Sequence, residues 1–223
     1  MSEKGYFIRE NRDVKAQKIL SVLGDAAGRE ITGFKALDIG TGNGGIARYV
    51  AGRGNEVTSV DVSQHEKTEG FTFVKVDGAK LPFPDNSFDA AISNHVIEHM
   101  PEYALHLGEV CRVLKKGGLC YFATPNRVFP KELHTKTYFL HWFPNKTFYG
   151  LLKTFGKYQE PLFLLTYSRM KKMFTENGFT YKEYTFDILK NPEKFHLDEI
   201  PKIGIPRFLI PFSKINIFVL KKI

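Results

Sequence analysis

The segment ALDIGTGNGG, residues 36–45, constrains the fold of this chain more than any other part of the sequence. An apolar run that contains Asp38 is followed by four glycines within six residues. Three of them, Gly40, Gly42 and Gly45, have the spacing G-x-G-x-x-G between a predicted strand and a predicted helix. Glycines at such a turn let the backbone bend tightly and let a ligand lie directly against it. The segment therefore predicts a nucleotide-type ligand site at the end of the first strand.

Short strand patterns alternate with helix patterns along most of the chain. The predicted strands cover residues 34–40, 55–63, 71–77, 88–93, 118–126, 180–188 and 214–222, and the predicted helices cover residues 13–25, 45–54, 63–69, 94–115 and 167–179. This order indicates an α/β fold with a doubly wound, mostly parallel seven-stranded sheet that binds ligands at the carboxyl ends of its strands. No helix-length pattern separates the last two strands, so we expect the final strand to run antiparallel.

The chain length of 223 residues suits one domain over residues 1–223. Its core is expected at about residues 13–125 and 166–223, with an insertion after the fifth strand at about residues 126–165. The sequence has neither a secretory signal pattern nor a run of about 18 apolar residues, so we expect a cytoplasmic protein, with peripheral membrane contact as an alternative.

A second acid separates the ligands that such a loop could hold. Asp61 ends the second predicted strand, where a carboxylate can accept both hydroxyl groups of an adenosine ribose, so NAD and S-adenosylmethionine both fit. Asp38 lies two residues before the first glycine. A carboxylate there would repel a pyrophosphate but would attract a ligand that carries an ammonium and a sulfonium. The local charge therefore favours S-adenosylmethionine.

Four successive segments carry a family resemblance: LDIGTGNGG, VTSVDVS, VKVDGAKLPFPDNSFDAAISNHVIEHM and EVCRVLKKGGLCYFATPN. They resemble the ordered motifs of the class I S-adenosylmethionine-dependent methyltransferases, in the branch that includes the ubiquinone and menaquinone biosynthesis enzymes. The resemblance covers residues 34–126, and INIFVLKK near the end of the chain is similar to the family's antiparallel seventh strand. It implies a Rossmann-like fold, S-adenosylmethionine as cofactor, and methyl transfer by in-line displacement.

The resemblance also implies a set of cofactor-binding positions. They are Gly40, Thr41, Gly42, Asp61, Val62, Asp77, Gly78, Ala79, Asn94 and His95, to which the charge argument adds Asp38. The first three would line the methionine part, Asp61 would hold the ribose hydroxyls, and Val62 would flank the adenine. Residues 77–79 would meet the adenine edge, and Asn94 and His95 would lie near the reactive sulfonium. Asp77 could instead stabilise a turn, and His95 could be a surface histidine.

Methyl transfer from a sulfonium mainly needs alignment and exclusion of water, and a base helps when the acceptor is a hydroxyl. The candidate catalytic residues are His95, His99 and His134. His95, Glu98 and His99 would share one face of the predicted helix by their i, i+3, i+4 spacing. Some relatives hold a divalent metal here with Glu-x-x-Glu-His, but this chain has a histidine at the first position. We therefore predict no metal site, and loss of activity on chelation would favour the alternative.

The predicted insertion, residues 126–165, combines aromatic residues with positive charge. Ten of its forty residues are aromatic, and six basic residues outnumber two acidic ones. A connection this long is usually functional, and the resemblance implies that it forms part of the acceptor pocket. His134, Tyr138, His141 and Trp142 are candidates for acceptor contact or for a lid, although such aromatic side chains could equally pack the insertion onto the sheet.

The composition of the insertion favours certain partners. A small-molecule acceptor that is phosphorylated, glycan-linked or lipid-linked would suit both the charge and the rings, and so would an anionic membrane surface. A nucleic acid ranks last because no RNA-binding module accompanies the domain. The oligomeric state is open. Two other functions are kept as alternatives: an NAD-dependent oxidoreductase that uses the same loop, and a nucleotide-binding module without turnover.

Overall fold

The computed structural model describes residues 3–63, 69–158, 160–199 and 201–223, and of residues 3–11 it describes the backbone only. The strands are β1 (Lys35–Ile39), β2 (Glu56–Asp61), β3 (Thr72–Lys75), β4 (Phe88–Asn94), β5 (Leu114–Pro125), β6 (Phe179–Glu183) and β7 (Ile215–Lys222). The α-helices are α1 (Glu3–Ala27), α2 (Gly45–Ala51), α3 (Tyr103–Val113), α4 (Asn145–Thr154), α5 (Tyr167–Glu176) and α6 (Thr185–Lys190). The 3-10 helices are η1 (Ile97–His99), η2 (Leu140–Trp142), η3 (Pro192–Phe195) and η4 (Arg207–Phe212).

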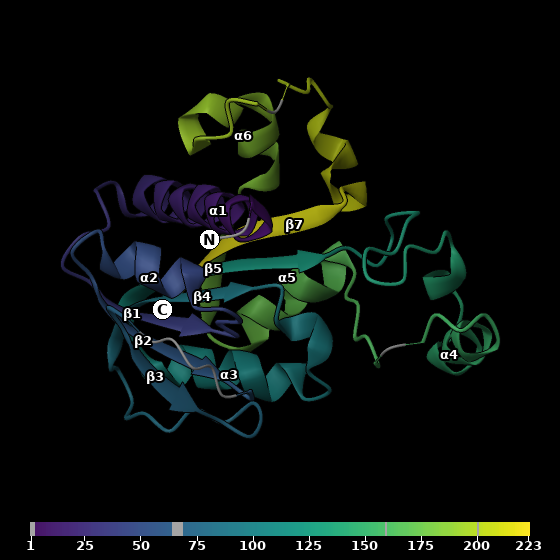
Figure 1. Cartoon of the computed structure of the whole chain (residues 1–223), viewed down its shortest axis with the longest axis horizontal. Helices are drawn as coiled ribbons and strands as arrows, with labels where there is room; N and C mark the ends of the chain where they lie inside the picture. The colour runs from purple at the N-terminus through teal and green to yellow at the C-terminus, as the bar shows by residue number, and fades with distance from the viewer. Residues whose placement is uncertain (1–2, 64–68, 159, 200) are drawn as a thin grey trace.

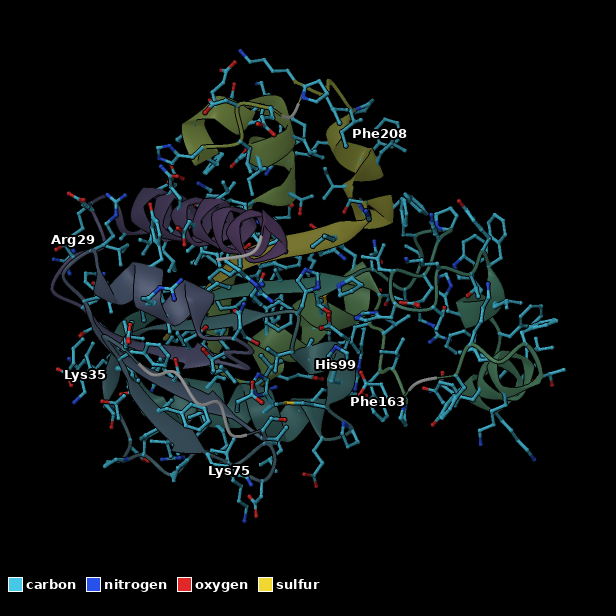
Figure 2. All side chains as sticks on the ribbon, in the orientation of Figure 1. Arg29, Lys35, Lys75, His99, Phe163 and Phe208 are labelled. Atoms are coloured by element: carbon cyan, nitrogen blue, oxygen red, sulfur yellow. The ribbon has the colours of Figure 1, made fainter. Side chains whose placement is uncertain are left out.

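The seven strands form one sheet in the order β3-β2-β1-β4-β5-β7-β6 (Figure 1). The first five strands pair in parallel, whereas β7 is antiparallel to both β5 and β6. The expected mixed sheet is thus confirmed. The strand order reverses between β1 and β4, and an open α/β sheet binds its ligands in the crevice at such a reversal. Figure 2 shows Lys35, where β1 begins, at the left edge of the molecule, and His99, which follows the carboxyl end of β4, near its middle.

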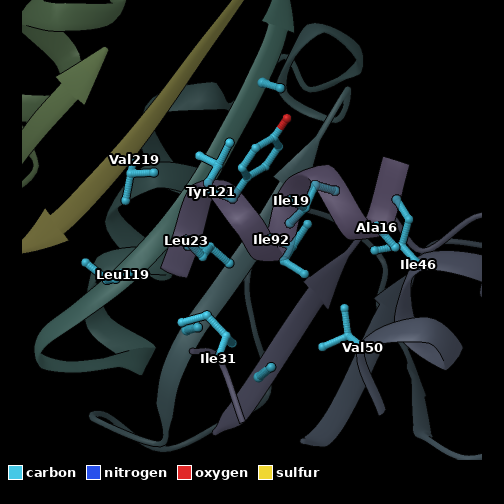
Figure 3. Close-up of a cluster of buried hydrophobic side chains, with 14 of the residues drawn as sticks. Ala16, Ile19, Leu23, Ile31, Ile46, Val50, Ile92, Leu119, Tyr121 and Val219 are labelled. Atoms are coloured by element: carbon cyan, nitrogen blue, oxygen red, sulfur yellow. The ribbon is translucent and has the colours of Figure 1, made fainter. Parts of the chain in front are cut away.

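Helices cover both faces of the sheet. On one face α1 directs Ala16, Ile19 and Leu23 onto the sheet, because residues three and four apart lie on the same side of a helix (Figure 3). They pack in one cluster with Ile92 of β4 and Tyr121 of β5. The other face is covered by α3 and α5, whose fully buried side chains include Leu107, Val110, Met170 and Phe174. The two apolar clusters fix the sheet and therefore fix the loops at its carboxyl edge.

Several predicted elements differ from the structure in extent: α1 is longer than the predicted helix 13–25, and β5 begins before the predicted strand 118–126. The predicted strand 180–188 ends at Glu183, and α6 follows it. The Glu183 carboxylate accepts hydrogen bonds from the backbone amides of Thr185 and Phe186, and it thereby satisfies donors that a helix start leaves unpaired. The predicted helix 94–115 is also wrong in its first part, because η1 ends at His99 and the next residue, Met100, precedes a proline and has an extended backbone.

Further differences lie between the last two strands. There α6, η3 and η4 occur where the sequence showed no helix-length pattern. The helix expected at residues 63–69 falls mainly on residues 64–68, which lie outside the described part of the chain.

Residues 126–165 project beyond the carboxyl end of β5 and carry η2 and α4 (Figure 1). Their two ends are joined, because the Arg127 amide donates to the Leu165 carbonyl at 3.1 Å. The Asn126 side chain donates to the carbonyl oxygens of Pro211 and Ser213, which ties the start of the segment to η4. Among the described residues, none of the helices has the length and apolar character needed to cross a membrane.

Candidate active site

The glycine loop follows β1 directly and turns in a way that needs glycine. Gly40 has a φ of +67°, and a Cβ built on it would lie 2.6 Å from Cγ2 of Val96. Gly42 also has a positive φ, and Gly44, in the left-handed region, precedes the first turn of α2. The amides of Gly40 and Thr41 both donate to the Val60 carbonyl. The loop is therefore held against β2, with bare backbone at the carboxyl edge of the sheet.

Asp61, at the end of β2, is bonded to the same loop. One of its carboxylate oxygens accepts from the Gly42 amide at 3.0 Å, and the other accepts from the Ser63 amide at 3.0 Å. These hydrogen bonds hold the carboxylate at the edge of the glycine loop, beside the exposed Val62. Asp61 therefore lies beside the glycine loop at the carboxyl end of β2.

Asp38 is buried beneath the loop, with 2% of its surface exposed. Its Oδ2 has no hydrogen-bond partner among the described residues. Burial raises the pKa of Asp38 to about 7, although the nearby Thr41 hydroxyl and Arg12 guanidinium partly oppose that effect. A ligand cation above the loop would favour the charged carboxylate again. Among the described residues, the contacts of the Asp38 carboxyl therefore offset only part of the cost of burying its charge.

A cavity of about 260 Å³ opens next to the glycine loop. It is lined by Ile39, Gly40, Val60, Asp61, Val62, Val76, Gly78, Leu81, His95, Val96, His99, Met100 and His106. Six predicted site residues are thereby brought together: Gly40, Asp61, Val62, Gly78, His95 and His99. The lining combines apolar side chains with one carboxylate and three histidines. Such a cavity can accept a flat heteroaromatic group together with a polar one.

The other predicted cofactor residues surround this cavity without lining it. Thr41 and Gly42 belong to the loop, Ala79 is buried, and Asn94 is half-buried at the end of β4. Asp77 is exposed and lines a neighbouring hollow with Lys75, Lys80 and Arg112.

His95, Glu98 and Thr124 form a chain of hydrogen bonds at the carboxyl ends of β4 and β5. Glu98 is fully buried, and its Oε1 lies 3.1 Å from Nδ1 of His95. The Thr124 hydroxyl donates to Oε2 of Glu98 at 3.0 Å. His95 has a left-handed backbone with a φ of +60°, so it does not share a helical face with the other two predicted residues. Glu98 does not line the cavity and instead holds the ring of His95 through a hydrogen bond. The expectation that His95, Glu98 and His99 share one helical face is therefore wrong.

A second histidine cluster joins the core to residues 126–165. Nδ1 of His99 lies 2.9 Å from Glu160, and the His99 and His134 rings meet edge to face with centroids 5.1 Å apart. Nδ1 of His134 lies 2.9 Å from Glu132, which is buried and also accepts hydrogen bonds from the amide and hydroxyl of Thr135. The hydrogen bond to Glu132 raises the pKa of His134 above its usual value.

One metal-capable set emerges from this cluster. Ligand atoms of Glu98, His99 and His134 lie within 4.8 Å of one another among the described residues. From the sequence, His95 was grouped with Glu98 and His99 instead, because a sequence does not reveal that His134 lies close to Glu98 and His99. The set offers one carboxylate and two imidazoles, which are suitable ligands for a divalent transition metal.

The remaining candidates in residues 126–165 lie apart from the cavity. His141 is buried and bonded to the Phe129 carbonyl at 2.9 Å. Tyr138 and Trp142 are both more than half exposed, and neither lines the cavity. Of these candidates, His134 alone approaches a cavity residue through a contact described here.

The structure adds His106 and Arg12 to the site, which the sequence analysis missed. His106 is fully buried in α3, lines the cavity, and has an Nδ1 without a partner in the described part of the chain. Burial lowers the pKa of His106 to about 4, so the ring is neutral near pH 7. Arg12 of α1 packs on the glycine loop, since a Cβ built on Gly45 would lie 3.0 Å from the Arg12 Cβ. A histidine inside an otherwise apolar helix face was the one available signal for His106.

Comparisons with known proteins agree with this geometry. A family model described as a methyltransferase domain matches residues 37–122. A demethylmenaquinone methyltransferase of Staphylococcus aureus (strain JH9) is 35% identical over 66% of this chain and 68% of that protein. A sterol 24-C-methyltransferase of Gibberella zeae is 37% identical, but the match spans only 39% of this chain and 26% of that enzyme.

A solved structure shares the fold. It is the 1,6-didemethyltoxoflavin-N1-methyltransferase of Burkholderia thailandensis, with 1,6-didemethyltoxoflavin and S-adenosylhomocysteine bound. It has a TM-score of 0.58 and is 17% identical, and the match covers 93% of this chain and 78% of that chain. At this identity the likeness concerns the fold alone.

Proposed function

We propose that this chain, which belongs to the class I S-adenosylmethionine-dependent methyltransferase family, transfers the cofactor's methyl group to a small-molecule acceptor. The observation that carries the proposal is the buried Asp38, whose unpartnered Oδ2 lies beneath a loop of bare glycine backbone. A carboxylate in that place suits a ligand with an ammonium and a sulfonium, and it disfavours a pyrophosphate. The oxidoreductase alternative therefore lacks support.

The residues that would hold the cofactor are those of the loop and the cavity. Gly40, Thr41 and Gly42 would meet its methionine part, and Asp61 would accept hydrogen bonds from the ribose hydroxyls. Val62 would flank the adenine. The other proposed contacts are Asp38, Asp77, Gly78, Ala79, Asn94 and His95. The fit rests on the backbone space at Gly40 and Gly42, on the orphaned oxygen of Asp38, and on the cavity beside them.

When bound, S-adenosylmethionine supplies a methyl group on a sulfonium, which is already a good leaving group. The protein then mainly has to align the acceptor and exclude water. For a hydroxyl acceptor, His95, His99 or His134 would take up the proton at an imidazole nitrogen. Glu98 holds the ring of His95, and Glu160 and Glu132 hold the rings of His99 and His134. Each candidate base therefore has a carboxylate that would stabilise its protonated form.

The acceptor is proposed to be apolar in part and to carry a phosphate, a glycan or a lipid chain. The name of the Staphylococcus aureus relative, a demethylmenaquinone methyltransferase, supports an apolar small molecule. The aromatic and basic composition of residues 126–165 supports an acceptor with an anionic or lipid-linked part. We further propose that the protein works in the cytoplasm in peripheral contact with anionic membranes.

Transfer of labelled methyl groups tests the proposed function. The purified protein is incubated with methyl-labelled S-adenosylmethionine and separate panels of phenolic, phosphorylated, glycan and lipid-linked acceptors. We expect label in one panel and its loss in the His95→Ala variant, with the exposed His196→Ala as the matched control. Label in no panel, together with no binding of S-adenosylhomocysteine, would reject the proposal.

A further inference from the structure

Four aromatic side chains point outward around η2. They are Tyr138, Phe139, Trp142 and Phe143, and we call them the aromatic tip; their exposed fractions are 58%, 49%, 51% and 50%. Of the two residues between them, Leu140 is half-buried, and His141 is turned inward and is 1% exposed. Monomeric proteins rarely leave adjacent large apolar groups in water without a use, and such groups mark interaction sites. The tip lies on the part of the chain that projects from the sheet.

The backbone holds the tip in its outward arrangement. Phe139 has a φ of +61°, a backbone conformation that residues other than glycine rarely adopt. Backbone strain of this kind is concentrated at functional sites. Its amide donates to the Pro130 carbonyl at 2.8 Å, and its ring meets Trp142 edge to face at 4.9 Å. The Arg127 guanidinium donates to the Phe143 carbonyl at 3.2 Å. The four rings are thus presented by an ordered turn and do not collapse onto the core.

The charge around the tip is positive. Residues 126–165 contain six basic and two acidic residues. Of the two acids, Glu132 is buried by its own loop, whereas Glu160 is exposed and pairs with His99. Lys136 and Lys146 are exposed, and neither forms an ion pair with a described residue. The exposed charge of this segment is therefore net positive, since its basic residues outnumber the one exposed acid.

We propose that the aromatic tip inserts into the headgroup layer of an anionic lipid bilayer, with Lys136 and Lys146 on the lipid phosphates. Tryptophan and tyrosine favour this layer because one part of the ring is apolar and another is polar, and lysines add attraction to anionic lipids. A protein partner would need a matching acidic groove, whereas a bilayer needs only rings at a rim of positive charge.

The segment that carries the aromatic tip also contacts the core beside the cavity. The segment leaves the sheet after β5 and returns at Phe163, whose amide donates to the Glu98 carbonyl at 2.7 Å (Figure 2). The segment that carries the tip therefore also contacts the core at Glu98, next to the cavity residue His99. Any role of this contact in methyl transfer rests on the proposed function, whereas membrane binding itself does not.

Vesicle sedimentation without cofactor tests the proposal. We expect the full chain to bind vesicles of phosphatidylcholine with phosphatidylglycerol and to bind vesicles of phosphatidylcholine alone at least about tenfold less. Trp142→Ala/Phe143→Ala and Lys136→Glu/Lys146→Glu should each reduce binding about tenfold. Phe208→Ala is the matched control, because Phe208 is 73% exposed on η4, away from the projecting segment (Figure 2). Binding should also weaken in about 1 M salt, where charges are screened beyond about 3 Å.

Three results would overturn the proposal. The first is no vesicle binding by the full chain, and the second is an equal loss of binding in Phe208→Ala. The third is a dimer in sedimentation velocity that Trp142→Ala/Phe143→Ala dissociates, since the tip would then be a contact between two copies of the chain. Calorimetry with S-adenosylhomocysteine on the same variants separates the two proposals. Retained cofactor binding with failed vesicle binding would reject only the membrane surface.

Discussion

The carboxylate of Asp61 accepts a hydrogen bond from the Gly42 amide at 3.0 Å, so the end of β2 and the glycine loop are directly connected. This contact links the two features that the sequence singled out separately. It also means that a substitution at either residue should affect the other.

Asp61→Ala should weaken the binding of S-adenosylhomocysteine by about 1–3 kcal/mol, the scale of hydrogen bonds to a charged group. Titration calorimetry measures the change directly. Asp198→Ala, which removes an exposed carboxylate elsewhere, is the control and should leave the affinity unchanged. An unaltered affinity in Asp61→Ala would contradict the ribose assignment.

Gly40→Ala should destabilise the chain more than Gly28→Ala does. Both glycines have a φ near +67°, but a Cβ at Gly40 would meet Val96 at 2.6 Å, whereas a Cβ at Gly28 has nothing within 4 Å. Because both substitutions carry the same cost of backbone conformation, the difference between their free energies of unfolding reports the clash alone. We expect a difference of about 1–3 kcal/mol, the scale of overpacking. Denaturant unfolding measures both values. Equal free energies of unfolding for the two variants would show that the loop can move away from Val96.

The affinity for S-adenosylmethionine should rise as the pH increases from about 6 to about 8. The pKa of Asp38 is raised by burial to about 7, and its deprotonated form attracts the ligand cation. The folding stability of the chain without ligand should change in the opposite direction. The pKa of Asp38 is higher in the folded chain than the ordinary 3.8, so its contribution to the free energy of unfolding is lost as the pH rises from about 4 to about 7. Calorimetry at several pH values measures the affinity. An equally steep pH dependence in Asp38→Asn would assign the effect to another group.

Glu132→Gln should lower the free energy of unfolding at pH 7 by about 1–3 kcal/mol, because Glu132 accepts several hydrogen bonds in a buried loop. Burial would raise the pKa of Glu132, but the hydrogen bonds from His134 and Thr135 outweigh it and lower the pKa to about 2. The stabilisation should thus be present above about pH 4.5 and be lost as the pH falls toward 2.

The same variant has a second readout. The pKa of His134, followed by NMR, should fall when Glu132 no longer carries a charge, since that contact raises it. Glu199→Gln, an exposed change, serves as the control. If the unfolding curves of Glu132→Gln and the unaltered chain coincide from pH 4.5 to pH 7, the buried loop does not depend on this carboxylate.

The sheet and the glycine loop could be predicted from the sequence because their signals are local. Short strand patterns that alternate with helix patterns indicated the sheet, and glycines between a strand and a helix indicated the loop. Asp61 could be placed at the site because parallel strands end at the same edge. The start of α6 escaped prediction, because Glu183 caps it through a hydrogen bond that no pattern of apolar residues reveals.

The histidine cluster depends on contacts between distant parts of the chain. His134 lies 35 residues after His99, and only the return of the projecting segment to the core brings their rings together. The left-handed backbone of His95 also removes this residue from the expected helical face, and the extended Met100 before Pro101 breaks the predicted helix. Such features follow from tertiary packing, which overrides local preference.

Titration calorimetry with S-adenosylhomocysteine and, in parallel, with NADH tests the central claim most directly. The account predicts micromolar binding of S-adenosylhomocysteine and no binding of NADH, because the buried carboxylate of Asp38 beneath the glycine loop disfavours a pyrophosphate. Binding of NADH instead, or of neither ligand, would contradict it.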